Sequence, residues 1–310
     1  MPEIPVARIC AVVVTYEPDL VVLGRLLEAT RPQVEGMLVV DNASPESALD
    51  WLRARAASGE ISLLALESNH GVAGGHNRGI AWARERGFTH VLMLDQDSLP
   101  AADMVRRLLK RMNALVAAGA KVAAVGPRCI DDQTGTELPF LRFGLMRTTR
   151  IDCRTAGGGY AEVDMLITSG KLISLDTLEK VGAMDEGLFI DNVDIEWGFR
   201  AQARGFALIG DCDAVLHHRI GDLIAAPWWL PRRRIMRHSP LRLYYMMRNR
   251  VVLYFRRDTP MRWVSQDVFR LVFKFALFVV FVAPRLENAR MMLLGVVHGL
   301  AGRQGRFKTE

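Results

Sequence analysis

The first part of the chain alternates short apolar runs with stretches of helical periodicity, and this alternation constrains the fold more than any other feature. Runs such as RICAVVVTY, GMLVVD and HVLMLD are rich in large apolar side chains, and stretches such as PDLVVLGRLLEAT separate them. Apolar strands that alternate with helices are typical of a mainly parallel sheet with helices on both faces. We therefore predict an α/β, Rossmann-like fold for this part of the chain.

Polar residues follow the predicted strands. The loop DNAS, residues 41–44, falls between a strand end and a helix that is expected to begin near Pro45, with Ser44 as its N-cap. Ligands of open α/β sheets bind beside the carboxyl ends of the strands. The loop is therefore a candidate part of a ligand site.

The strongest local signal is the segment LMLDQDSLP, in which an apolar strand ends in Asp95 and Asp97, separated by one residue. Paired carboxylates at a strand end supply the hard oxygen ligands that Mg²⁺ and Mn²⁺ prefer. A divalent cation there would neutralise the charge that develops on a departing diphosphate. A solvated acidic turn would contain the same two residues, so the pair alone does not decide between the two interpretations.

A second acidic group, Asp191, Asp194 and Glu196, lies in the segment LFIDNVDIEWGFR at the start of a predicted helix. The helix dipole favours acidic residues in a first turn, so a purely structural role is one alternative. The other is that a carboxylate in a partly apolar cleft beside Trp197 takes a proton from an attacking hydroxyl group. We predict Asp194 for that role.

Two further segments carry candidate ligand groups. His217 and His218 follow the short predicted strand DAVL; a neutral imidazole there could complete a metal site, although a lone histidine is more often a core or surface residue. The segment NHGVAGGHNRG, residues 69–79, opens a helix, and its glycines would permit close approach of the backbone to phosphates. Its spacing and its place after the third strand differ from the dinucleotide fingerprint, which argues against a dehydrogenase.

The composition changes beyond Ala226. Residues 231–310 hold 17 Lys and Arg against 4 Asp and Glu, a balance of +13, whereas the remainder has 23 basic and 30 acidic residues, a balance of −7. We predict two or three helices here, and the middle one has an uninterrupted apolar stretch of about ten residues, too short to span a bilayer. An interfacial helix fits better. We therefore expect the chain to divide into an α/β domain, 1–226, and a basic helical region, 227–310.

The basic region has two interpretations. Its arginines stand beside Trp228, Trp229, Tyr244, Tyr245 and Trp263, a mixture that suits a lipid headgroup layer. The same side chains could instead pack a helical subdomain or a dimer contact. We exclude nucleic acid as a partner, because an apolar helix next to the basic run would have no use there.

The cysteines and the N-terminus bear on the compartment. Cys10, Cys129, Cys153 and Cys212 form no C-x-x-C pair, and we interpret them as reduced thiols of a cytosolic protein. The N-terminal sequence MPEIPVARIC lacks a basic start followed by an apolar run and a cleavage site. Secretion is therefore not predicted.

Several separated motifs occur in an order that resembles the family 2 inverting glycosyltransferases, which have the GT-A fold. They are VVVTYEP, VVDNAS, NHGVAGGHNRG, LMLDQDS, GAMDEGLFIDNVDIEWGFR and LHHRIG, and the resemblance covers about residues 8–222. Within that family, DQDS, FIDNVD and HSPLRLYYMMRN are most similar to bacterial rhamnosyltransferases that use dTDP-L-rhamnose. Many relatives have Glu-Asp where this chain has Val193 and Asp194, so the additional Asp191 could share the role of the base.

The resemblance implies a role for each matching residue. Asp194 would be the base and Glu196 a supporting carboxylate, while Asp97 would bind the metal with His218 as the distal ligand and Asp95 shared between metal and donor. Ser169, Gly170 and Trp197 would lie on the acceptor side. The residues implied in binding the nucleotide sugar are Thr15, Tyr16, Asp41, Asn69, Gly71, Gly74, Asn77, Asp95 and Gln96.

The expected reaction is a single displacement that inverts the anomeric carbon and needs Mg²⁺ or Mn²⁺. L-rhamnose would pass from dTDP-L-rhamnose to a hydroxyl of a lipid-linked glycan or glycolipid acceptor in bacterial envelope synthesis. The expected location is the cytoplasmic side of the inner membrane, peripheral or interfacial, with a homo-oligomer as a further option. The alternatives are another donor, such as a UDP-hexose or UDP-galactofuranose, and a catalytically silent membrane scaffold.

Overall fold

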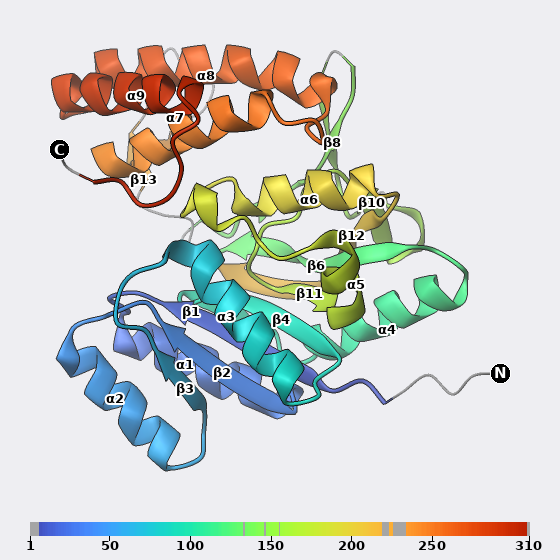
Figure 1. Cartoon of the computed structure of the whole chain (residues 1–310). Helices are drawn as coiled ribbons and strands as arrows, with labels where there is room; N and C mark the ends of the chain where they lie inside the picture. Colours follow the sequence, from blue (N-terminus) through green and yellow to red (C-terminus); the bar gives the residue numbers. More distant parts are fainter. Residues whose placement is uncertain are drawn as a thin grey trace.

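The predicted alternation of strands and helices is present in the computed structural model of the chain (Figure 1), which describes residues 6–132, 134–145, 147–154, 156–218, 223–225 and 234–308. Its first half contains β1 (Ile9–Thr15), α1 (Leu20–Thr30), β2 (Gly36–Asp41), α2 (Glu46–Ala57), β3 (Ser62–Ala65), α3 (Gly71–Glu85), β4 (His90–Asp95), β5 (Ser98–Pro100), α4 (Met104–Ala117) and β6 (Val122–Asp131). The apolar runs are the strands, as predicted.

The second half begins with short strands and ends in three long helices. The elements are β7 (Glu137–Leu138), β8 (Phe140–Phe143), β9 (Thr148–Ile151), β10 (Tyr160–Val163), β11 (Lys171–Ser174), α5 (Leu175–Val181), α6 (Val193–Ala203), β12 (Ala207–His218), β13 (Leu223–Ala225), β14 (Arg234–Met236), α7 (Pro240–Tyr254), α8 (Met261–Phe281) and α9 (Arg285–Leu300).

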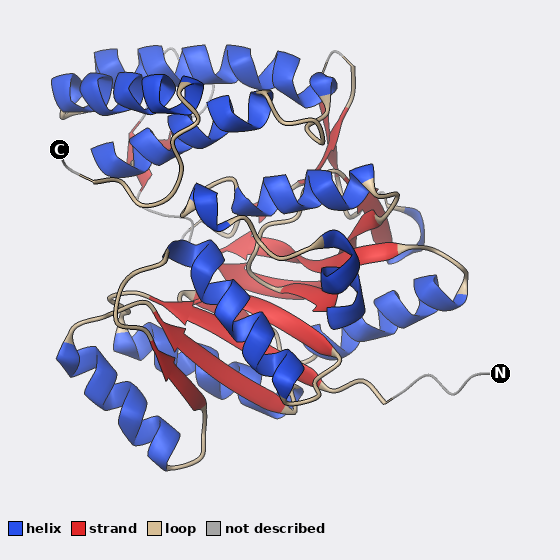
Figure 2. Ribbon diagram, in the orientation of Figure 1, coloured by secondary structure: helices blue, strands red, loops and turns tan. Residues whose placement is uncertain are grey.

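The main sheet of the described residues has the strand order β10-β12-β6-β11-β4-β1-β2-β3, with β5 paired to β12 and β7 to β6. Strands β1 to β4 pair in parallel, as do β6 and β12, whereas β11 runs antiparallel between β4 and β6. Figure 2 shows this sheet between two layers of helices. The mainly parallel sheet is therefore confirmed.

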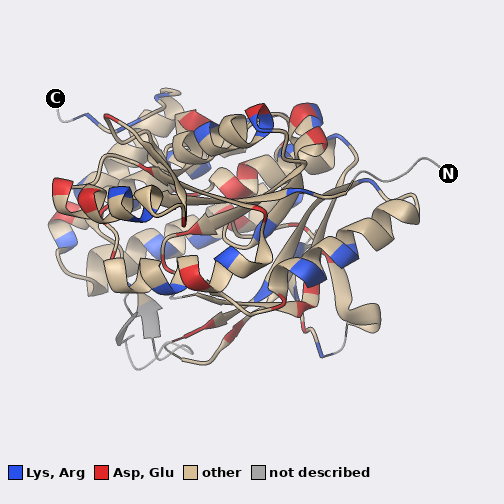
Figure 3. Ribbon diagram, turned by 90° about the horizontal axis from the view of Figure 1, so that it is seen from below, with Lys and Arg blue, Asp and Glu red and all other residues tan. Residues whose placement is uncertain are grey.

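The two faces of the sheet have separate cores, because successive strand residues point to opposite sides. Val12 and Val14 of β1 pack toward α3, α5 and α6, whereas Val13 packs toward α1, α2 and α4. Burial of each such side chain contributes about 1.5–3 kcal/mol to folding. Figure 3, viewed from the end away from α7 to α9, shows acidic and basic residues together on the outer helices.

The C-terminal helices form a further layer above α6 (Figure 1) and share part of its core. Trp263 at the start of α8 packs edge-on against Phe199 of α6, with ring centres 5.3 Å apart. The predicted division between residues 226 and 227, together with Trp228 and Trp229, lies outside the described residues. Among the helices that are described, none combines the length and apolar character needed to cross a membrane.

Three local predictions are wrong. The N-cap of α2 is Pro45, because the Ser44 hydroxyl is engaged by Asp41 and by the Glu17 N–H. The short strand expected at DAVL is part of a longer strand, β12, whose register with β6 shifts between Asp211 and Val215.

The third correction concerns the cysteines. Cys153 and Cys212 form a disulfide, with Cα atoms 5.3 Å apart, whereas Cys10 and Cys129 are free and buried. The two paired cysteines are 59 residues apart in sequence. Spacing along the chain could not reveal their proximity, which depends on the pairing of β10 with β12.

Candidate active site

The two carboxylates of the DQD segment stand at the carboxyl end of β4, where the chain turns into β5. Strand β5 pairs with the end of β12, and this pairing places Ser98 opposite His218. The Nδ1 atom of His218 lies 3.1 Å from Ser98 Oγ and 3.5 Å from Asp97 Oδ1. The structure therefore brings together Asp97 and His218, which are far apart in sequence and were predicted as metal ligands.

Ser169 and Gly170 contact the end of β4, next to this turn. The Asp95 N–H donates to Ser169 Oγ at 3.1 Å, and the hydroxyl oxygens of Ser169 and Ser98 are 2.5 Å apart. Gly170 has a φ of +81°, and a Cβ there would lie 2.5 Å from Cγ of Pro127. The Gly170 N–H donates to the Met93 carbonyl at 2.8 Å, so Ser169 and Gly170 both bind the end of β4 that leads into the turn.

Several charged groups act on the pKa of Asp95. Burial raises the pKa of Asp95 to about 6; the charges of Asp97 and Asp194 act in the same direction, and His218 and Arg242 oppose them. Asp194 begins α6 and Arg242 lies in α7. The charge of Asp194 therefore acts on Asp95, and the role of Asp194 as the base stays a prediction.

Asp194 occupies the first turn of α6, where the Ile195 N–H donates to its Oδ1 at 2.9 Å. Burial raises the pKa of Asp194, and the positive charge of Lys171 opposes this effect. A carboxyl group with a raised pKa is suited to accept and release a proton near neutral pH.

Lys171 is a functional candidate that the sequence analysis missed. It lies in β11 opposite Met93 of β4, it is 1% exposed, and its Nζ is 5.5 Å from the centre of the Trp197 ring. Burial lowers the pKa of Lys171 to about 8, whereas Asp194 and Asp95 act to raise it. The available signal was a lysine inside the apolar strand segment KLIS.

His76 lies close enough to Lys171 for its charge to act on the imidazole. His76 is fully buried, and neither ring nitrogen has a hydrogen-bond partner among the described residues. Burial and the charge of Lys171 lower the pKa of His76 to about 3. The imidazole is therefore neutral at physiological pH.

Asp191 has a different environment from Asp194. Its carboxylate receives two N–H groups of Arg242, with Nη2 to Oδ1 and Nε to Oδ2 both at 3.2 Å. Its backbone has a φ of +63°. Asp191 therefore forms an ion pair with α7, a contact that its local sequence did not indicate.

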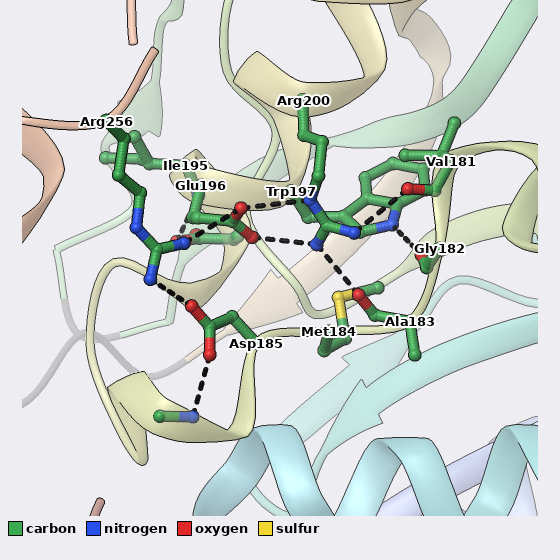
Figure 4. Close-up of polar contacts among 12 residues, drawn as sticks. Val181, Gly182, Ala183, Met184, Asp185, Ile195, Glu196, Trp197, Arg200 and Arg256 are labelled. Atoms are coloured by element: carbon green, nitrogen blue, oxygen red, sulfur yellow. Dashed lines mark hydrogen bonds and ion pairs between the residues drawn. The ribbon is translucent and has the colours of Figure 1, made fainter. Parts of the chain in front are cut away.

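Glu196 faces away from Asp194, because residues two apart on a helix do not share a side. It is bound by Arg200 at 2.8 Å and Arg256 at 3.1 Å, and Arg256 also pairs with Asp185. Figure 4 shows Glu196 between the two arginines. An open hollow of about 440 Å³ is lined by this ion-pair network. The structure thus gives Glu196 a tethering role in place of the expected support of the base.

Trp197, predicted on the acceptor side, is part of the core. It is fully buried, and its Nε1–H donates to the Gly182 carbonyl at 2.9 Å. Its only link to the site in these contacts is its ring, whose centre is 5.5 Å from the Lys171 ammonium group.

Five of the residues predicted to bind the nucleotide sugar lie at the carboxyl ends of β1, β2 and β4: Thr15, Tyr16, Asp41, Asp95 and Gln96. The Thr15 hydroxyl donates to Asp41 Oδ1 at 2.9 Å, and the Ser44 N–H donates to Asp41 Oδ2 at 2.8 Å. The Gln96 amide binds the backbone of Tyr16 through both its oxygen and its nitrogen. These bonds join the loops that follow β1, β2 and β4 into one edge of the sheet. Tyr16 is 43% exposed at this edge.

The glycine-rich segment at the start of α3 serves packing. A Cβ on Gly79 would lie 2.2 Å from Val12 Cγ1, and one on Gly71 would lie 2.3 Å from the Phe189 carbonyl oxygen. The same test places a Cβ of Gly74 2.7 Å from His70 Cβ. The close approach is therefore to β1 and to neighbouring protein groups, and phosphate binding by these glycines stays a prediction.

Two asparagines of this segment also make protein contacts. Asn69 Oδ1 accepts from the N–H of Gly71, the first residue of α3, at 2.8 Å. Asn77 exchanges two hydrogen bonds, each 2.9 Å long, with the backbone of Met184. Contact with a donor sugar by either residue is untested.

The described residues contain no group of three or more His, Cys, Asp or Glu side chains that could hold a metal ion by themselves. Asp97 and His218, with Asp95 beside them, nevertheless provide a donor set of suitable chemistry. Mg²⁺ is commonly bound by one or two carboxylates together with phosphate oxygens of the substrate. The residues therefore fit a cation that is bound jointly with a diphosphate. His217 is engaged elsewhere, 3.0 Å from Asp132.

Comparisons with known proteins bear on the family and the fold. The profile described as Glycosyl transferase family 2 matches residues 10–161. The dTDP-rhamnosyl transferase RfbF of Shigella flexneri is 30% identical, over 96% of this chain and 97% of its own length. The undecaprenyl-phosphate mannosyltransferase of Micrococcus luteus is 29% identical, over 56% of this chain and 73% of its own length.

Two solved structures share the fold. The structure of S. aureus TarS 1-349 in complex with UDP has a TM-score of 0.54 at 14% identity, covering 98% of this chain and 94% of that one. The structure of GalNAc-T7 with UDP, GalNAc and Mn²⁺ has a TM-score of 0.60 at 12% identity, covering 95% of this chain and 56% of that one. The GT-A architecture predicted from the motifs is therefore confirmed.

Proposed function

The chain belongs to glycosyl transferase family 2, and from this premise we propose that it transfers L-rhamnose from dTDP-L-rhamnose to a hydroxyl of a glycan or lipid-linked acceptor in envelope polysaccharide or glycolipid synthesis. It is a glycosyltransferase, and its similarity to a rhamnosyl transferase over nearly the whole length supports the choice of sugar. The observation that carries the proposal is that Asp97, just after β4, lies 3.5 Å from His218 at the end of β12, while the charge of Asp194 from α6 acts on the neighbouring Asp95.

The proposed base is Asp194. Its carboxylate takes the proton of the acceptor hydroxyl, whose oxygen forms a bond to the anomeric carbon while the bond to the diphosphate oxygen breaks on the opposite side. The configuration inverts, and no covalent sugar–enzyme intermediate forms. Asp191 is the weaker candidate, because both of its carboxylate oxygens face the guanidinium group of Arg242.

Charge on the leaving diphosphate is the second requirement of the reaction. A bound Mg²⁺ or Mn²⁺ would neutralise that charge, and we propose Asp97, Asp95 and His218 as its ligands. The buried cation Lys171 adds a fixed positive charge on the Asp194 side of the same site. Such charges stabilise a departing oxyanion without rearrangement during the reaction.

The donor pocket is proposed at the shared edge of β1, β2 and β4. Thr15, Tyr16, Asp41 and Gln96 order this edge and would contact the nucleotide, with Asn69 to Asn77 at its border. Ser169 and Gly170 would shape the acceptor side indirectly, through the β4–β5 turn. A UDP-sugar donor would use the same edge, so donor choice needs a direct test.

We also propose that the C-terminal region, 227–310, attaches the catalytic domain, 1–226, to the cytoplasmic face of the inner membrane. Residues 261–308 contain eight Lys and Arg against two Asp and Glu, a charge that is complementary to anionic lipid headgroups. A broad apolar surface on α8 and α9 supports this location. Its exposed side chains are Val268, Phe269, Val272, Phe273, Val280 and Phe281 on α8 and Leu286, Leu293, Val297 and Leu300 on α9.

The base assignment is tested with Asp194→Asn. Turnover of dTDP-L-rhamnose with Mg²⁺ or Mn²⁺ should fall by about 10²–10⁴-fold, since the amide cannot take a proton. The affinity for dTDP, measured by calorimetry, should stay near that of the wild type. Asp191→Asn is the matched variant, and it should retain more activity than Asp194→Asn.

The donor is tested by incubating the wild type with a panel of nucleotide sugars and a lipid-linked acceptor, with product masses as the measurement. Transfer of hexose from a UDP donor but no transfer from dTDP-L-rhamnose would overturn the proposed sugar. Unchanged turnover in Asp194→Asn would remove the assigned base. Absence of transfer from every donor would favour the silent scaffold.

A further inference from the structure

The segment that precedes the proposed base has an unusual backbone. Phe189, Asp191 and Asn192 have φ values of +63°, +63° and +64°, which side chains with a Cβ rarely adopt. Phe189 also has a ψ of −65°, and the Ile190 N–H donates to the Leu188 carbonyl at 2.8 Å, which defines a γ-turn of the rare, strained form. Such a conformation persists only where its surroundings hold it in place.

Asn249 of α7 provides the main hold. It is fully buried, and its Nδ2 lies 2.9 Å from the Leu188 oxygen, 2.7 Å from the Ile190 oxygen and 2.8 Å from the Asp191 oxygen. One amide group therefore gathers three carbonyl groups of the segment. Loss of these donors would remove this partner from the Ile190 and Asp191 carbonyls, whereas the Leu188 carbonyl would still accept from Arg248.

Arg248, the preceding residue, adds a second hold and orients the first. Its Nη2 donates to the carbonyls of Leu188 at 2.9 Å and Gly187 at 3.2 Å, and its Nε donates to Asn249 Oδ1 at 2.9 Å. Its Nη1 donates to the Gly305 carbonyl at 2.5 Å. The arginine is 1% exposed, so these bonds form away from water.

The opposite side of the segment rests on α3. The Phe189 carbonyl accepts from the Val72 N–H at 2.9 Å, and its ring stacks on Tyr245 of α7 at 5.2 Å. Helix α6 begins at Val193, directly after the strained residues. The direction in which α6 starts, and hence the position of Asp194, depends on how this segment is held between α3 and α7.

We propose that Asn249, oriented by Arg248, is a positioning residue for the transfer reaction: it fixes the backbone of residues 188–191 and thereby the place of the base. This inference rests on the proposed function, in which Asp194 takes the proton. It makes α7 of the C-terminal region part of the active-site framework, whereas that region was proposed above only as an attachment to lipid.

The test is Asn249→Asp in the full chain. The aspartate keeps the size of the side chain and the acceptor for Arg248 Nε, but it replaces the donor by an oxygen that repels three carbonyls. We expect kcat for rhamnosyl transfer to fall by about 100-fold, the loss that a small misplacement of a catalytic group produces. Affinity for dTDP should be unchanged, because the nucleotide edge lies on β1, β2 and β4.

Amide hydrogen exchange of the peptides that cover 187–195 is the readout that does not depend on activity. These peptides should exchange faster in Asn249→Asp, whereas those of β1 and β4 should not change. Asn288→Asp is the matched control, because Asn288 of α9 is also fully buried and its Nδ2 donates to the Val282 carbonyl at 2.9 Å, away from residues 187–195. It should lower Tm and leave kcat near the wild-type value.

Wild-type kcat and exchange in Asn249→Asp would overturn the proposal. So would a loss of kcat in proportion to a loss of Tm and of dTDP affinity, since that pattern indicates general destabilisation. If Asn249→Asp does not fold, Asn249→Ala, which removes the repulsion, replaces it with the same criteria. If the wild type transfers no sugar, the proposed function fails separately, and hydrogen exchange alone decides whether Asn249 holds the segment.

Discussion

The charge of Lys171 acts on the pKa of the proposed base, Asp194. Its ammonium group is buried between the sheet and α6, with Trp197 on one side and the charges of Asp95 and Asp194 within range. A buried charge is costly unless compensated, so its presence indicates that nearby negative charge is needed for stability as well. The same charge opposes the rise in the pKa of Asp194 that burial causes.

Lys171→Met should therefore move the acidic limb of the kcat/KM profile to higher pH. The base must be ionised, so activity is lost as pH falls through its pKa, and removal of the neighbouring positive charge raises that pKa further. The measurement is initial rate against pH, with Lys180→Met, an exposed lysine of α5, as the control. A limb that stays in place or moves to lower pH would contradict the assignment of Lys171 as the counter-charge.

The residues that could be predicted are those whose signal is local. Asp95 and Asp97 follow an apolar strand directly, and Asp194 stands at a helix start, so pattern and chemistry pointed to them. Lys171 and Arg242 join the site only through contacts across the fold, which no spacing reveals. The expectation that Glu196 supports the base could have been questioned from the sequence, because residues two positions apart on a helix do not share a side.

At the scale of elements, α9 lies unusually close to α7. A Cβ on Gly295 would lie 2.5 Å from the Tyr244 carbonyl oxygen, and one on Gly299 would lie 2.8 Å from that of Arg248. Two glycines four residues apart thus form a flat contact on one side of α9. This contact supports the part of α7 that carries Arg248 and Asn249.

Gly299→Val should force α9 away from α7 and lower the free energy of unfolding by about 1–3 kcal/mol, as overpacking in a core does. Urea denaturation followed by circular dichroism is the measurement. Leu300→Val, one position further on the exposed side of the same helix, is the control and should have little effect. Equal stability of the two variants would show that the helices separate without cost.

The order of the elements was predictable, and the exceptions have physical causes. Strand β12 extends well beyond the expected short strand DAVL and includes two acidic residues, Asp211 and Asp213. In the structure Asp211 is buried, accepts the N–H groups of Asp213 and Ala214, and pairs with Arg111. These bonds lie at the register shift between β12 and β6. One of them comes from Arg111 of α4, a hundred residues earlier in the chain.

In the complete fold, α8 and α9 lie in the outermost layer, on the side of α7 away from the sheet (Figure 1), and they carry the exposed apolar side chains. Phe269 is 78% exposed and Leu293 is 54% exposed. Burial of such side chains in a lipid interface would contribute about 1.5–3 kcal/mol each. Attraction of the basic residues to anionic headgroups would add to this at low salt.

The double variant Phe269→Asp, Leu293→Asp should therefore bind vesicles containing anionic lipid at least about tenfold more weakly than the wild type. Flotation at several salt concentrations is the measurement. Val116→Asp, an exposed apolar residue of α4, is the control and should not affect flotation. If the double variant instead changes from dimer to monomer in light scattering while flotation stays the same, the surface is a contact between subunits.

Residues near position 305 return to the segment before the proposed base, where the Gly305 N–H donates to the Gly187 carbonyl at 2.6 Å and the Phe307 N–H donates to the Tyr245 hydroxyl at 2.7 Å. A ribosome adds these residues long after it has finished the sheet, at about 5–20 residues per second. A nascent chain can therefore form the proposed nucleotide site on β1, β2 and β4 early, while the segment before Asp194 still lacks these contacts. Turnover should begin only once the final helices have emerged and docked, which keeps unfinished copies from consuming donor.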